Sequence, residues 1–115
     1  MDFVIIPRER IRLDPEGFSL RKGEDEIFSI RWRDVREIVA FKRDLLTSDC
    51  VCLAFRVADQ DPVVEVNEEL EGFILLSDEM MHRFPSISAD WLTRVTQPPF
   101  AENRQRIYGE PGGVG

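Results

Sequence analysis

The sequence has few residues of the kinds that build metal and redox sites. Its 115 residues include two cysteines, Cys50 and Cys52, and one histidine, His82. Zinc would need two ligands besides the cysteines, and only one histidine is present. On a strand, Cys50 and Cys52 would point to the same face, where a disulfide between them would be strained. We therefore expect two reduced thiols, no metal site and no cofactor.

Long apolar segments are also missing. No run approaches the roughly 18 residues that a membrane-spanning helix requires. The apolar segment at the N-terminus, residues 1–7, is short and contains the acidic Asp2, so we expect no secretory signal. Seven glycines and seven prolines are too few for a disordered or collagen-like chain. With 43% hydrophobic and 32% charged residues, the composition predicts a globular protein, which we expect to be cytoplasmic.

Motifs typical of catalysis are absent as well. The sequence has neither a glycine-rich phosphate loop nor a Gly-x-Ser-x-Gly turn. We therefore predict no catalytic residues and no enzyme activity. One alternative stays open: a small-molecule-binding domain or small enzyme with a pocket at the sheet–helix junction. His82 would act there as a base for Cys50 or Cys52 if the fold brought them together.

What the sequence does have is an uneven distribution of charge. Residues 1–57 carry 11 basic and 11 acidic side chains, whereas residues 58–115 carry 4 basic and 11 acidic ones. The net charge of −7 therefore belongs to the second half. Such a surface repels nucleic-acid phosphates and anionic lipids, so we expect neither as a partner. It attracts a basic protein, although acidic residues also simply keep a small domain soluble. We predict partner-binding residues in the densest part: Asp59, Asp61, Glu65, Glu68, Glu69 and Glu71.

Alternating polar and apolar residues predict strands over the first two thirds of the chain. The expected stretches, separated by turns, are residues 10–14, 18–21, 27–32, 35–42, 50–57 and 63–66. Both faces of residues 50–57 are apolar or small, which predicts a strand covered on both sides. An exposed face there, including Cys50, Cys52 and Ala54, would instead suit a homo-oligomer contact.

The pattern then changes to that of helices. Phe73, Leu76, Met80 and Phe84 are spaced as one face of a helix, which Pro85 would end. Ser88 is the expected N-cap of a second short helix that carries Trp91. We expect Trp91 and Trp32 in the core, with a partner-facing position as the alternative. The chain is predicted to form a single domain over residues 1–100, with a C-terminal tail at 101–115.

Strands followed by helices predict an α+β fold. We expect an antiparallel curled sheet or partial barrel of about six to seven strands, followed by one or two C-terminal helices. This layout resembles a pleckstrin-homology-like domain over about residues 8–96. Lipid-binding members carry basic residues on the first hairpin, but here acidic residues offset those charges.

Several short runs of residues carry a second resemblance, to a family of proteins. They are residues 30–38 (IRWRDVREI), 41–44 (FKRD), 64–66 with 71–73, and Phe84-Pro85 followed by Trp91. Together they resemble a family of small uncharacterised bacterial proteins, and the layout is similar to some immunity proteins of bacterial toxin systems. The resemblance implies an intracellular bacterial protein without known catalysis. In combination with the charge, it predicts a protein-binding module, in its sharpest form an inhibitor of a basic toxin.

Overall fold

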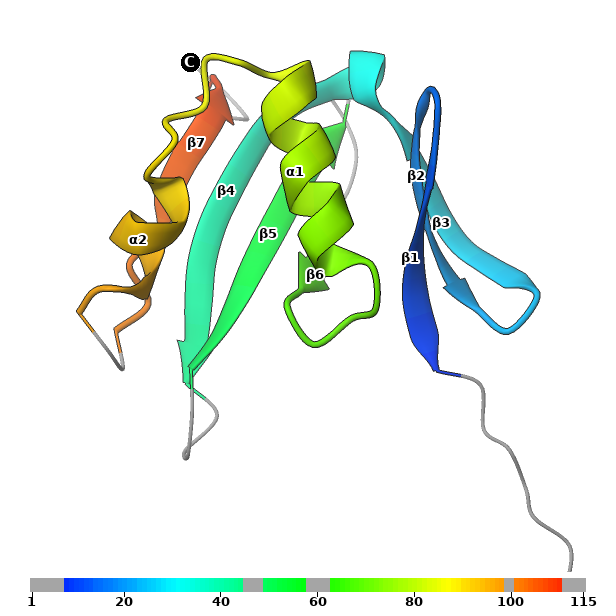
Figure 1. The fold of residues 1–115 in the computed structure, drawn as a ribbon, viewed down its shortest axis with the longest axis horizontal. Coiled ribbons are helices and arrows are strands. Elements are labelled where there is room, and N and C mark those ends of the chain that lie inside the picture. Colours follow the sequence, from blue (N-terminus) through cyan, green and yellow to red (C-terminus); the bar gives the residue numbers. More distant parts are fainter. Residues whose placement is uncertain (1–7, 45–48, 58–62, 99–100, 111–115) are drawn as a thin grey trace, which may run out of the picture.

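The computed structural model describes residues 8–44, 49–57, 63–98 and 101–110 (Figure 1). These form two antiparallel sheets and two α-helices. In chain order the elements are β1 (Glu9–Asp14), β2 (Gly17–Lys22), β3 (Asp25–Arg31), the 3₁₀ turn η1 (Trp32–Asp34), β4 (Val35–Asp44), β5 (Asp49–Val57), β6 (Val64–Asn67), α1 (Phe73–Arg83), α2 (Trp91–Thr96) and β7 (Gln105–Gly109). The α+β class and the predicted strand-rich first part are confirmed.

The two sheets follow each other along the chain. The first has the strand order β1-β2-β3, and the second has the order β6-β5-β4-β7. The turn η1 leads from one sheet into the other, and the helices lie on one side of the second sheet (Figure 1). The described residues thus form two separate antiparallel sheets and no closed barrel, where we expected a single curled sheet or partial barrel.

The connection between β6 and α1 is held against β1. The N–H of Ile11 donates to the carbonyl of Glu71 at 2.8 Å, and Arg10 forms a parallel bridge with Glu71. Gly72, just before α1, has a φ of +92°, and a Cβ there would lie 2.5 Å from the Ile11 carbonyl oxygen. A glycine is needed at this close contact, because any side chain would push β1 away from the connection.

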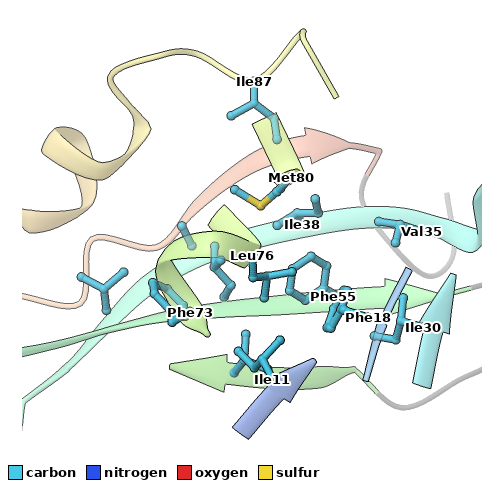
Figure 2. Close-up of a cluster of buried hydrophobic side chains, with 14 of the residues drawn as sticks. Ile11, Phe18, Ile30, Val35, Ile38, Phe55, Phe73, Leu76, Met80 and Ile87 are labelled. Atoms are coloured by element: carbon cyan, nitrogen blue, oxygen red, sulfur yellow. The ribbon is translucent and has the colours of Figure 1, made fainter. Parts of the chain in front are cut away.

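One hydrophobic core is shared by both sheets and both helices. Its buried members include Ile11 and Phe18 from the first sheet, Phe55 from the second, and Leu76 and Met80 from α1 (Figure 2). The helical spacing of Phe73, Leu76 and Met80 places all three on the buried side of α1, as the sequence predicts. Burial of this shared surface is what holds the two sheets together.

A row of aromatic rings crosses this core. Phe18 lies 5.0 Å from Phe55 and 5.2 Å from Trp32 between ring centroids. Trp32 in turn lies 5.8 Å from Phe84, and Phe84 lies 4.1 Å from Tyr108. The row joins both sheets, the end of α1 and β7. The predicted core positions of Trp32 and Trp91 are confirmed, since both are buried.

Three local features differ from the sequence-based expectation. Residues 105–109 lie in the segment predicted as a tail, yet they form β7, which pairs with β4. Trp32 begins the turn η1 and does not end a strand. The N-cap of α2 is Asp90 and not Ser88, whose hydroxyl donates to the Asp90 carboxylate. That bond, with the nearby Arg94, lowers the pKa of Asp90.

Candidate functional site

The predicted acidic residues fall into separate groups in the structure. Glu68, Glu69 and Glu71 lie together in the connection between β6 and α1, and all three are exposed. Glu65 lies on β6, opposite Ala54 in the sheet register. Asp59 and Asp61 lie outside the described residues, so their predicted role stays a prediction. We call residues 68–71 the acidic turn.

Glu65 is already engaged by a cation. Its two carboxylate oxygens accept hydrogen bonds from Arg43, Nε at 2.9 Å and Nη2 at 2.7 Å. The hydrogen bond to Glu65 is the main cause of a raised pKa of Arg43. Because a bidentate pair satisfies both groups, Glu65 offers less uncompensated charge to a partner than the other predicted acids.

Glu68 has a structural role in the sheet. Its backbone N–H donates to the carbonyl of Val51 at 2.9 Å, and its Oε1 accepts from the Val51 N–H at 2.9 Å. The carboxylate thus takes the place of a strand carbonyl where β6 ends. Glu69 is positioned by a hydrogen bond from its N–H to the side chain of Asn67 at 2.9 Å. The carboxylates of Glu69 and Glu71 have no hydrogen bond or ion pair with the described residues.

An apolar groove runs between α1 and α2, beside the acidic turn. Its volume is about 390 Å³. Phe73 and Trp91 line it from the core side, while Ile74 and Leu92 line it with side chains that are 76% and 47% exposed. Among the described residues that line it, the charged groups are the carboxylates of Glu68 and Asp78. We call this feature the α1–α2 groove.

Ile74, Asp78 and the exposed position of Leu92 were not among the residues predicted from the sequence to bind a partner. The exposed position of Ile74 could have been predicted from the sequence. The core stripe of α1 uses Phe73, Leu76 and Met80, so the neighbouring Ile74 and Leu75 must point elsewhere. Both are among the most exposed large hydrophobic residues of the described chain. Large apolar side chains that gather at a groove are typical of interaction surfaces.

The residues of the enzymatic alternative are not brought together. Cys50 and Cys52 lie on β5 opposite Arg43 and Phe41 of β4, on the face turned away from the helices. His82 is exposed on α1, and this helix lies on the other side of the sheet (Figure 1). A base and a nucleophile must be within hydrogen-bonding reach, so these three side chains form no catalytic pair in this arrangement.

The environment of the thiols also keeps them protonated. Burial, together with the neighbouring Cys50 and Glu65, raises the pKa of Cys52 from 9.0 to about 12. Burial also raises the pKa of Cys50, with the nearby Glu69 adding to the effect. Since the thiolate is the nucleophile and the metal ligand, neither sulfur is activated. In the described part of the chain, no three His, Cys, Asp or Glu side chains gather as metal ligands would.

The predicted coverage of β5 on both sides is confirmed for its described neighbours. Cys50, Cys52 and Ala54 are all buried on the face away from the helices. Phe41 lies beside Cys52, and the guanidinium groups of Arg43 and Arg104 lie over its ring at 5.3 and 4.6 Å. Side chains of β4 and of the segment before β7 therefore cover the face that was the alternative position for a homo-oligomer contact.

Comparisons with protein-family models, with curated proteins and with solved structures found no match for this chain. None of the helices in the described ranges is long and apolar enough to cross a membrane.

Proposed function

We propose that this chain is a non-catalytic protein-binding module that binds a basic protein, as an immunity-type inhibitor of a basic toxin does. One observation carries the proposal: the acidic turn, with the free carboxylates of Glu69 and Glu71, leads directly into α1, whose exposed Ile74 lines the α1–α2 groove. Glu68 belongs to both features, because it starts the turn and lines the groove. Protein interfaces combine such an apolar centre with a polar rim.

The chain segment that forms the acidic turn and most of α1 carries charge of one sign. Residues 63–82 contain six acidic side chains and no lysine or arginine. Among the described residues, Glu65 is paired with Arg43 and Glu79 with Arg83, whereas Glu69, Glu71 and Asp78 have no cationic partner. An uncompensated patch of this kind steers a basic protein toward the site and raises the association rate.

A second candidate function is the binding of a small molecule in the same groove. The volume of about 390 Å³ favours it, because ligand pockets usually measure roughly 300–1,000 Å³. The charged groups that line the groove would select a cationic, partly apolar molecule. Thermal-shift screening with such compounds tests it, and stabilisation that the variant Asp78→Asn abolishes would support this candidate.

The relationship to pleckstrin-homology-like domains and to bacterial immunity proteins is part of the proposal. Its support is an antiparallel, strand-rich first part followed by α1, which packs over the second sheet (Figure 1). The strand β7 after the helices is an addition to the expected layout. A location in the bacterial cytoplasm belongs to the same proposal.

The test is capture of partners from a lysate of the source organism at low and at high salt. A stoichiometric basic protein that high salt releases is the expected result, because surface charge pairs are screened by salt. Co-expression then shows whether the chain protects cells from that protein. If no basic protein binds at either salt concentration, the proposed function is wrong.

Charge-reversed variants locate the interface. Glu69→Lys with Glu71→Lys should slow association about tenfold at low salt, because both carboxylates are free to attract the partner. The matched control is Glu16→Lys with Glu110→Lys, which changes the net charge equally. Both residues are exposed; Glu16 lies in the turn between β1 and β2, and Glu110 directly follows β7. That turn and the end of β7 lie at the end of the molecule away from the β6–α1 connection (Figure 1). Equal effects of both pairs would mean that net charge alone acts.

A further inference from the structure

The α1–α2 groove is lined mainly by apolar side chains, together with the carboxylates of Glu68 and Asp78. Buried rings of Phe73 and Trp91 and the exposed chains of Ile74 and Leu92 make it apolar. Burying exposed apolar surface is favourable because it removes that surface from water. An apolar group of a partner would therefore gain by entering the groove.

The charged groups of the lining narrow the choice of occupant. Oε1 of Glu68 is used by Val51, but its second carboxylate oxygen has no described partner. Asp78, on the side of α1 that faces the groove, has no hydrogen bond or ion pair with the described residues. Two free acceptors of like charge at one apolar groove favour a ligand that carries a cation next to its apolar group.

We propose that the α1–α2 groove is the anchor site of the interface, and that it takes a large apolar side chain flanked by lysine or arginine in the partner protein. The inference rests on the proposed function and adds to it the position and chemistry of the contact. The apolar side chain packs against Ile74, Trp91 and Leu92. The flanking cation pairs with Asp78 or with the free oxygen of Glu68, and the acidic turn attracts the rest of the basic partner.

This arrangement divides two tasks between neighbouring residues. Glu69 and Glu71 govern how fast the partner arrives, because long-range attraction acts on the encounter. The groove governs how long the partner stays, because a filled apolar pocket must be vacated on dissociation. Mutations in the two parts should thus change different rate constants.

The first experiment uses short peptides and the whole protein labelled with ¹⁵N. One peptide, Lys-Lys-Leu-Leu-Lys-Lys, carries the proposed chemistry, and Lys-Lys-Ser-Ser-Lys-Lys has the same charge without it. We expect the first to shift the amide resonances of Ser77, Trp91 and Leu92 in a saturable manner and to bind at least about fivefold more tightly. Equal binding of the two peptides, or no binding of either, would overturn the proposal.

Variants then identify the groove as the site. Ile74→Ser with Leu92→Ser removes two exposed groove residues, so the core should remain intact. Leu75→Ser is the matched control, because Leu75 is also exposed on α1, at 64%, and does not line the groove. We expect the groove variant to weaken binding of the leucine peptide and of a captured partner at least about fivefold, mainly by faster dissociation, with the control unchanged.

Other occupants give distinct results. If the groove variant converts a dimer seen by light scattering into a monomer, the groove belongs to a second copy of this chain and the proposal fails. If the uncharged peptide Ser-Ser-Leu-Leu-Ser-Ser binds as tightly as the lysine peptide, the cationic partner is wrong. If charge reversal of Glu69 and Glu71 weakens a captured partner but the groove variant does not, the proposed function stands and this inference fails.

Discussion

Glu68 completes the edge of the sheet by binding the backbone of Val51. Its Oε1 accepts the Val51 N–H at 2.9 Å, and its own N–H donates to the Val51 carbonyl at 2.9 Å. A residue expected only to attract a partner thus also ends β6 and fixes the start of the acidic turn. The structural role and the role of the charge can be separated by replacing Glu68 with glutamine. The amide oxygen can still accept the hydrogen bond from Val51, but the side chain carries no charge.

Glu68→Gln and Glu68→Ala should differ in stability although both remove one negative charge. The alanine variant leaves the partly buried Val51 N–H without its acceptor, which should lower the free energy of unfolding by about 1–2 kcal/mol. The glutamine variant should stay within about 0.5 kcal/mol of the wild type, because its carbonyl oxygen replaces Oε1. Urea unfolding measures both, and equal stability of the two variants would show that the hydrogen bond contributes nothing.

Lys42 should be needed to hold the end of α2. Its Nζ donates to Asp49 Oδ2 at 3.0 Å, to the Thr96 carbonyl at 2.9 Å and to the Pro98 carbonyl at 2.7 Å, and the side chain is 1% exposed. Lys42→Met should lower the free energy of unfolding by about 3 kcal/mol, because three partly buried oxygen acceptors lose the ammonium group that donates to them.

The same variant should loosen α2 locally. Hydrogen exchange of the α2 amides should speed up more than that of the amides of β2, since Thr96 ends α2. Lys22→Met, at an exposed position, is the control and should change neither quantity. A Lys42→Met protein with wild-type stability and exchange would contradict the role of this network.

The two thiols should react slowly in the folded protein. Burial raises the pKa of Cys52 to about 12, so little thiolate exists at neutral pH. We expect a disulfide reagent such as dithionitrobenzoate to modify the protein at pH 8 far more slowly than the urea-unfolded chain. Fast modification of both cysteines in the folded state would contradict their burial.

The raised pKa of Cys52 also sets the sign of a pH dependence. The folded state holds the proton more tightly than the unfolded state, whose thiol has the ordinary pKa of 9.0. The contribution to stability is therefore complete below about pH 9 and is lost as the pH rises from about 9 to about 12. Cys52→Ala should make the alkaline loss of stability smaller, which unfolding curves at pH 8 and pH 10.5 measure.

Local patterns in the sequence predicted most of the elements correctly. The alternation over residues 10–14 and 18–21, with a turn between them, predicted the first two strands, which pair as β1 and β2, and the spacing of Phe73, Leu76 and Met80 predicted α1. Both patterns depend on residues close in sequence, so they can be recognised without the fold. The strand β7 could not be recognised in this way. It is held by pairing with β4 and by Tyr108 against Phe84, contacts that no local pattern shows.

The candidate site was predictable only in its charge. The sequence by itself determined that the second half is acidic and that residues 63–82 lack lysine and arginine. The register of the sheet decides which carboxylates are free. It pairs Glu65 with Arg43, 22 positions away, and Glu68 with Val51, 17 positions away. The groove likewise exists only because the fold places α2 beside α1. Charge and periodicity are properties of the chain, whereas free carboxylates and a groove depend on contacts between distant segments.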